Sequence, residues 1–308
     1  MTNMTLREEL KKEVGILMPN YTMHDAQVVK FNDRKLIGFT AVREDEHGGP
    51  TFWVDNWVVE AAEAGASSME LAQKIAASFL NIPSDIADVK KAAAKGSLPE
   101  ISAEDLKRSV RPRLADLERN REFLADKAYT EVGGGFALYV VLELSHGGEA
   151  TFGISLTKGA LEAFDWPYSE EEILEMAKNN IEPQLVPLEA EVAFQSTPWL
   201  EIPNCLEHPE MFDPNNHANV LTSSDRQFGA SALFAPGVKE RLYEMVGGSY
   251  YIIPSSIHEV LIVPAHVVGD PKAQLDMVYE ANRTVVNEED VLSDRVLLFD
   301  GKSFKDIK

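Results

Sequence analysis

Apolar and polar positions alternate most regularly between residues 219 and 265, where they predict one continuous structural unit. After an extended start at residues 219–222, apolar side chains recur every three to four positions, as on a helix that packs against a core. The Gly-Gly pair at residues 247–248 predicts the end of that helix, because glycine readily adopts the left-handed conformation of a C-terminal cap. The β-branched and aromatic runs 250–253 and 260–263 predict two neighbouring strands joined by a short corner.

Helical and strand patterns also alternate through the rest of the chain, which indicates an α+β fold. Apolar stripes predict helices, and short β-branched runs between turn residues predict antiparallel strands. Outside the first unit, the predicted helices cover residues 6–18, 71–79, 173–179 and 271–280, and the predicted strands cover residues 27–31, 35–43, 51–54, 136–144, 185–194 and 295–299. We therefore expect antiparallel sheets with helices packed on one face.

Residues 85–128 differ from their surroundings, because they are rich in charge and show no strand pattern. We interpret them as a helical connector between two domains. The N-terminal α+β domain would comprise residues 1–84, and the C-terminal α+β domain would comprise residues 129–308.

Two short patterns recur about 100 residues apart. A His-Gly-Gly turn followed by Thr-Phe occurs at residues 47–52 and again at residues 146–152. A Ser-x-x-Glu capping box, which satisfies free N–H groups at a helix start, begins at Ser67 and again at Ser169. The recurrence suggests two similar strand-turn-strand-helix halves. Chance similarity is the alternative, since glycine is common in hairpin turns.

The charge balance excludes some classes of function. The 308 residues carry a net charge of −21, which argues against an extended phosphate-binding surface and makes nucleic acid an unlikely partner. No apolar run approaches the roughly 18–20 residues that span a bilayer, and the charged N-terminus lacks the pattern of a signal peptide. The single cysteine, Cys205, cannot form an internal disulfide. Together these features predict a cytoplasmic protein without a membrane segment.

Motifs with known chemistry are sparse. Ser155 and Lys158 have the S-x-x-K spacing of serine acyl-transferases, but the partner motifs of those enzymes are missing, so a helix start with a surface lysine is favoured. Cys205, His208 and His217 are residue types that bind metals, yet they are loosely spaced and lack a convincing fourth ligand. We therefore expect no metal and no cofactor.

The best candidate site lies where the start of the predicted 219–265 helix should meet the corner at residues 254–259. Asp225 and Arg226 lie at the predicted helix start, and His258 and Glu259 lie on the corner. An open helix N-terminus attracts negative charge, so these four residues could bind an anionic ligand or an acidic side chain of a partner. The alternative is structural: Asp225 caps the helix, Glu259 is solvated, and His258 satisfies a backbone carbonyl.

Three segments resemble a known family. The 219–265 unit, the Leu-Ser-Asp at residues 292–294 and RPRLADLERNREFL at residues 111–124 resemble an uncharacterised bacterial family, a domain of unknown function common in anaerobic gut bacteria. The chain from about Phe136 onward is also similar to the YtpQ-type family, through TFGISLTKGALEAFDWPYSEEEILEMAKNNI and the segment from Asp225 to Ser231. These motifs are apolar runs, caps and turns, so the resemblance implies a fold and no catalytic residues.

These observations favour a non-enzymatic binding or interaction protein, whose partner is an unknown protein or small molecule. The alternative is a hydrolase-like enzyme whose site is assembled from scattered polar residues around positions 223–226 and 254–259. A cleft that contains titratable side chains would favour the enzyme, and a flat apolar patch would favour the interaction protein.

Overall fold

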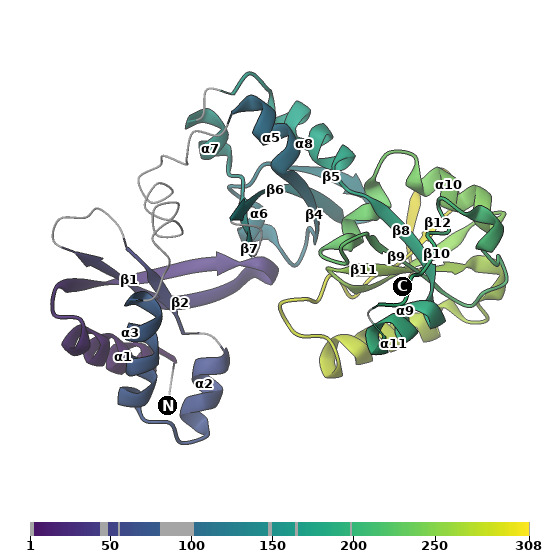
Figure 1. Ribbon diagram of the computed structural model, residues 1–308. Coiled ribbons are helices and arrows are strands. Elements are labelled where there is room, and N and C mark those ends of the chain that lie inside the picture. Colours follow the sequence, from purple (N-terminus) through teal and green to yellow (C-terminus); the bar gives the residue numbers. More distant parts are fainter. Residues whose placement is uncertain are drawn as a thin grey trace. The chain divides into compact units, whose positions relative to one another are not determined.

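The computed structural model describes residues 3–43, 49–54, 56–80, 102–146, 150–163, 166–197 and 199–307. The chain divides into two compact units, Met1–Ser102 and Ala103–Lys308 (Figure 1). Both units combine helices with sheets, and every strand pairing among the described residues is antiparallel. The predicted α+β class with antiparallel sheets is therefore confirmed.

The first unit is a three-stranded sheet with helices on one face. Its elements are α1 (Asn3–Leu17), β1 (Tyr21–Lys30), β2 (Arg34–Arg43), β3 (Thr51–Trp53), α2 (Asn56–Glu63) and α3 (Ser68–Leu80), and the strand order is β1-β2-β3. Leu10 on α1, Phe39 on β2 and Ile75 on α3 are buried together in one core. Left-handed Asn32 and Asp33 form the turn between β1 and β2, as predicted for this hairpin.

The second unit begins with a sheet built around one central strand, β6. Its elements are α5 (Ala103–Ser109), β4 (Val110–Asp116), α6 (Arg121–Leu124), β5 (Tyr129–Gly133), β6 (Phe136–His146), β7 (Ala150–Ser155), α7 (Lys158–Ala163) and α8 (Glu170–Asn179). Strand β4 pairs with one edge of β6, and β5 and β7 pair with the other. The helical interpretation of residues 85–128 is therefore wrong for β4, and the described part of that segment from residue 103 belongs to this unit. All but one residue of β4 are buried, so the alternation that identifies a half-exposed strand is absent.

A six-stranded sheet with the order β13-β12-β10-β11-β9-β8 forms the rest of the second unit. Its elements are β8 (Pro183–Pro187), α9 (Leu188–Ser196), η2 (Pro209–Met211), β9 (Asn219–Ser223), η3 (Gly229–Phe234), α10 (Val238–Val246), β10 (Tyr250–Ser256), β11 (Glu259–Pro264), η4 (Ala265–Val267), α11 (Pro271–Thr284), β12 (Val296–Phe299) and β13 (Phe304–Ile307). Strands β10 and β11 pair as the sequence predicts. Helices α10 and α11 lie on opposite sides of the sheet (Figure 1), and each packs into its own core, so helices cover both faces here rather than one.

Two local predictions in this region are wrong. No helix starts at Asp225, because a turn and the 3-10 helix η3 fill the segment before α10, which begins at Val238 after the left-handed Gly237. The strand predicted at residues 185–194 ends at Pro187, where α9 begins.

The predicted recurrence extends to the order of elements. The described part of the first unit follows α1-β1-β2-β3-α2-α3, and the start of the second unit follows α5-β4-β6-β7-α7-α8 with α6 and β5 inserted. Both capping boxes form: the N–H of Glu70 donates to Ser67 Oγ at 3.2 Å, and the N–H of Glu172 donates to Ser169 Oγ at 3.2 Å. The two His-Gly-Gly turns lie largely outside the described residues.

Candidate functional site

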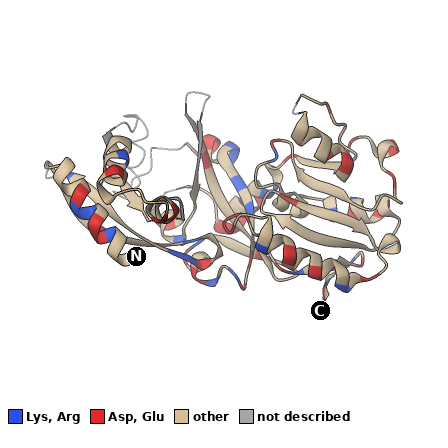
Figure 2. Ribbon diagram, turned by 90° about the horizontal axis from the view of Figure 1, so that it is seen from below, with Lys and Arg blue, Asp and Glu red and all other residues tan. Residues whose placement is uncertain are grey.

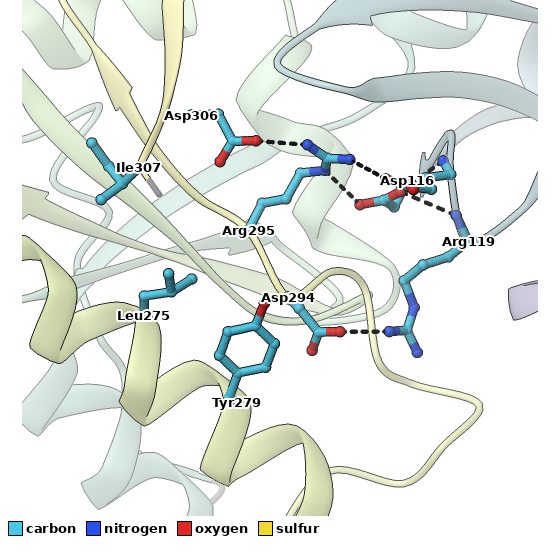
Figure 3. Close-up of a pocket in the computed structure, with 9 residues that line it drawn as sticks. Asp116, Arg119, Leu275, Tyr279, Asp294, Arg295, Asp306 and Ile307 are labelled. Atoms are coloured by element: carbon cyan, nitrogen blue, oxygen red, sulfur yellow. Dashed lines mark hydrogen bonds and ion pairs between the residues drawn. The ribbon is translucent and has the colours of Figure 1, made fainter.

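Two arginines of the second unit each lie at a polar cavity. The first, here named the Arg295 cavity, has a volume of about 500 Å³ (Figure 3). Its lining joins the end of β4, helix α11 and the C-terminal strands: Asp116, Glu118, Arg119, Leu275, Tyr279, Asp294, Arg295, Asp306 and Ile307.

Each nitrogen of the Arg295 guanidinium meets a carboxylate (Figure 3). Nε lies 3.1 Å from Asp116 Oδ2, Nη1 lies 2.6 Å from Asp306 Oδ2, and Nη2 lies 2.8 Å from Glu118 Oε2. Burial opposes the charge of this group, but Asp116 and Asp306 outweigh that effect and raise the pKa of Arg295. All three nitrogens therefore have a carboxylate partner within the protein.

Asp116 anchors this network from a position that is only 2% exposed. Its Oδ1 accepts hydrogen bonds from the backbone N–H groups of Glu118 and Arg119 at 2.8 and 3.2 Å. Its Oδ2 accepts a hydrogen bond from Ser293 Oγ at 2.5 Å in addition to the one from Arg295. Two segments that are distant in sequence are therefore fastened together by one buried carboxylate, which is a structural role.

The second arginine, Arg113, lies between two adjoining cavities of about 470 and 180 Å³, here named the Arg113 cavities. The larger is lined by Arg113, Tyr139, Val141, Glu143, Gly153, Ser155, Asp225, Gln227 and Phe228. The smaller is lined by Arg111, Pro112, Arg113, Glu143, Asn180, Ile181, Glu182, Ser223, Ser224, Asp225 and Gln227.

Strand register creates the floor of the larger cavity. Arg113 lies opposite Tyr139, and Val141 and Glu143 lie opposite Ser155 and Gly153, so these side chains share one face of the sheet. The small residues of β7 leave room above Val141 and Glu143. A Cβ at Gly153 would lie only 2.9 Å from Val141 Cγ1, so a larger residue would displace Val141.

The Arg113 guanidinium has fewer hydrogen-bond acceptors than the Arg295 guanidinium. The residue is 8% exposed, and it donates from Nη2 to Glu143 and from Nη1 to the Pro112 carbonyl at a long 3.5 Å. Its guanidinium carbon lies 3.9 Å from the centroid of the Phe228 ring. Burial lowers the pKa of Arg113 despite the nearby Glu143 carboxylate. Burial also raises the pKa of Tyr139 to about 12, which keeps its hydroxyl protonated.

The facing wall is a loop, residues 224–228, that contains two left-handed non-glycine residues. Arg226 has φ 56° and Phe228 has φ 55°, a conformation that costs L-residues roughly 1–2 kcal/mol each. Buried Glu191 holds the Arg226 guanidinium through contacts of 2.9, 3.2 and 3.1 Å, and His258 Nδ1 accepts the N–H of Phe228 at 3.1 Å. At the next residue, a Cβ on Gly229 would lie 2.2 Å from the Ser223 nitrogen, so only glycine allows this close approach.

One protein-family model matches almost the whole chain. The model described as "Family of unknown function (DUF5688)" matches residues 3–301. The chain belongs to this family. No curated protein and no solved structure matches it. Membership in the DUF5688 family agrees with the expected uncharacterised family and assigns no activity. Among the described residues, every helix is too short or too polar to cross a bilayer.

The four predicted site residues lie near each other, but they do not face one cavity. Thr222 Oγ1 donates to the His258 carbonyl at 2.8 Å, so the corner lies beside the 224–228 loop as expected. Asp225 lines both Arg113 cavities, whereas Arg226 pairs with Glu191 and His258 supports Phe228. Glu259 accepts a hydrogen bond from Ser255 Oγ at 3.1 Å. The helix N-terminus expected to attract an anion is absent, and Asp225 instead accepts hydrogen bonds within its own turn.

The sequence did not identify Arg113, Glu143 or Gln227. The signal was weak: Arg111 and Arg113 alternate with apolar residues, which is consistent with a strand, but their charge favoured a helical connector. Glu143 lies 30 residues from Arg113, and only the pairing of β4 with β6 brings them together.

The structure also bears on the two weaker motifs, the S-x-x-K spacing and the metal-binding residue types. Ser155 lines the larger cavity, but Lys158 Nζ lies 5.6 Å from the centroid of the Tyr129 ring, and Lys158 is not part of that lining, so the pair does not form an acyl-transferase site. Among the described residues, no group of three or more His, Cys, Asp or Glu side chains is arranged to hold a metal ion. The expected lack of a metal stays a prediction.

Proposed function

We propose that this DUF5688 protein is a non-enzymatic, cytoplasmic binding protein that holds a small polar molecule in the Arg113 cavities. The observation that carries the proposal is the left-handed loop 224–228, which lines these cavities with Asp225 and Gln227. Strained backbone of this kind persists only where surrounding contacts enforce it, and it gathers at ligand-binding sites. Here Glu191 and His258 enforce it.

The chemistry of the cavities supports the same function. The larger volume, about 470 Å³, lies within the range of roughly 300–1,000 Å³ that is typical of ligand pockets. Val141 and Phe228 offer apolar surface, and Arg113, Asp225 and Gln227 offer charge and hydrogen bonds. This mixture suits a small molecule better than a nucleic acid. Along the ribbon in Figure 2, Lys and Arg positions are interleaved with Asp and Glu positions.

Two finer expectations accompany the proposal. The origin in anaerobic gut bacteria and the similarity to the YtpQ-type family both stay predictions, and neither names a ligand.

The test is a thermal-shift screen of the full chain with amino acids, dipeptides, nucleosides, sugars and polyamines. A ligand at about 100 times its Kd stabilises the folded state by about 2.7 kcal/mol, which raises Tm by several degrees. The proposal is wrong if no compound class raises Tm.

The site is checked with variants that fill it. Ser155→Leu and Gln227→Leu each place an apolar side chain in the larger cavity, so both should lose the ligand-dependent shift measured from their own Tm. Ser196→Leu, an exposed change at the end of α9, serves as the matched control and should keep the shift. An equal shift in all three variants would place binding elsewhere.

A further inference from the structure

Arg113 retains hydrogen-bond donors for which the described residues provide no acceptor. A guanidinium has five N–H groups, and within the described chain those of Arg113 meet one oxygen of Glu143 and the distant Pro112 carbonyl. Arg113 is nevertheless nine-tenths buried and lines both cavities, so its remaining donors face cavity space rather than bulk water. A planar guanidinium with free N–H groups is suited to a carboxylate.

Asp225 retains acceptor capacity on the opposite wall. Its Oδ1 accepts hydrogen bonds from Ser223 Oγ at 2.6 Å and from the Gln227 N–H at 3.0 Å. Its Oδ2 accepts none from the residues that the structure describes. Asp225 lines both cavities together with Arg113, so a free acceptor and free donors face the same space.

The charged residues that line the cavities disfavour a ligand that carries only positive or only negative charge. The linings contain two arginines, Arg111 and Arg113, and three carboxylates, Glu143, Glu182 and Asp225. An anion would approach these carboxylates, and a cation would approach the two arginines, each at a cost in a partly desolvated site. A ligand with one positive and one negative group meets an opposite charge at each end.

We infer that the Arg113 cavities bind a small zwitterion of the α-amino-acid type, with its carboxylate on Arg113 and its ammonium on Asp225. This inference rests on the proposed binding function and names its ligand class. Val141 and Phe228 form the apolar surface for the ligand's side chain, and Gly153 and Ser155 leave the space that the side chain fills. Gln227 adds an amide that can bind either charged end.

The experiment compares three probes that share one skeleton, by isothermal titration calorimetry on the full chain. L-Leucine carries both charges, N-acetyl-L-leucine carries only the carboxylate, and L-leucinamide carries only the ammonium. Leucine should bind about tenfold or more tightly than either analogue, because each analogue loses one charged hydrogen-bonding partner. A panel of the other common amino acids covers a different side-chain preference.

Two variants test which residue binds the ammonium and which binds the carboxylate of the ligand. Asp225→Asn keeps the oxygen that accepts hydrogen bonds from Ser223 and Gln227 but removes the charge. The variant should therefore bind leucine only as weakly as the parent binds N-acetyl-L-leucine. The double variant Arg113→Met/Glu143→Gln should bind leucine only as weakly as the parent binds L-leucinamide. Asp213→Asn, in a similar turn outside both cavities, is the matched control and should bind as the parent does.

The outcomes separate the two proposals. Equal affinity for all three probes, or unchanged leucine binding in Asp225→Asn, overturns the zwitterion and leaves the binding function standing. The zwitterion is also overturned, with the binding function intact, if no amino acid binds while another compound raises Tm in the parent and not in Ser155→Leu. If no compound binds at all, both proposals fail.

Discussion

The Arg295 and Arg113 cavities both combine arginines with acidic side chains, but their central arginines are paired differently. Arg295 has a carboxylate at each of its three nitrogens, and its pKa is raised. Arg113 is more deeply buried, has one carboxylate oxygen and one distant carbonyl as acceptors, and has a lowered pKa. Charge satisfied within the protein indicates a structural joint, whereas charge left under-coordinated beside strained backbone indicates a binding site.

Volume alone does not separate the two. The Arg295 cavity, at about 500 Å³, is as large as the larger Arg113 cavity, at about 470 Å³. The number of uncommitted donors and acceptors is what differs, and it can be tested by removing groups at each cavity in turn.

The largest expected effect is on stability, from Asp116→Ala. The substitution leaves Arg295, Ser293 and two backbone N–H groups without their shared acceptor. Each buried donor left without an acceptor costs about 1–3 kcal/mol, and several donors lose theirs here, so the urea midpoint of the second unit should fall sharply.

Glu118→Ala is the matched control, because Glu118 pairs with the same guanidinium but its side chain is 67% exposed. Exposed ion pairs contribute about 0–1 kcal/mol, so its midpoint should barely move. If the two variants lose equal stability, the Arg295 network is not anchored by Asp116.

The fold was predictable where local periodicity decides it. Strands β10 and β11 follow from their apolar runs, and the β1–β2 hairpin follows from Asn32 and Asp33. Strand β4 was missed because Pro112 and its arginines obscure the pattern of a strand buried on both faces. The helix expected at Asp225 has suitable apolar spacing, yet Phe228 bonds to His258, 30 residues away, and stabilises a turn instead. No local pattern records that contact.

The second prediction applies the same removal at the other arginine. Arg113→Met alone should cost about 2 kcal/mol, because Glu143 then loses one partner but still has Arg111 at 3.6 Å. The double variant Arg113→Met/Glu143→Gln should recover most of that loss, since replacing both members of a buried pair is often nearly neutral. Chemical denaturation of the parent, the single variant and the double variant measures this recovery. A double variant as unstable as Asp116→Ala would make Arg113 a structural residue like Arg295.

The third prediction isolates the strain in the 224–228 loop. Arg226→Ala and Arg226→Gly both lose the ion pair with buried Glu191, so both should be destabilised. Glycine tolerates φ 56° and alanine does not, so the glycine variant should be more stable than the alanine variant by about 1 kcal/mol. Equal urea midpoints would show that the left-handed conformation stores no strain, and the main support for the binding site would be lost.

The candidate site was predictable only in part, for a physical reason. Asp225, Arg226, His258 and Glu259 were chosen as polar residues at a predicted junction, and the junction exists. Arg226 and His258 hold the loop in place, Glu259 bonds to Ser255 within the corner, and only Asp225 lines the cavities. The other wall comes from Arg113 and from β6 and β7, whose contribution depends on strand register. Register is fixed by pairing between distant segments, and one sequence shows only the segments.

The smallest expected effect concerns Glu259 and pH. Burial, which outweighs the hydrogen bond from Ser255, raises the pKa of Glu259 above its ordinary value of 4.5. The folded state therefore holds this proton more tightly than the unfolded state, so the group's favourable contribution is present below pH 4.5 and is lost as pH rises through the raised pKa. Glu259→Gln removes the unfavourable charge, so the variant should exceed the parent at pH 7 by a few tenths of a kcal/mol. The urea midpoints of parent and variant should differ at pH 7 and converge at pH 4, because the parent carboxyl is largely protonated at the lower pH. A variant that is less stable at pH 7 would show that the Glu259 charge supports the loop, and that the wall facing Arg113 depends on more ionic contacts than the one between Arg226 and Glu191.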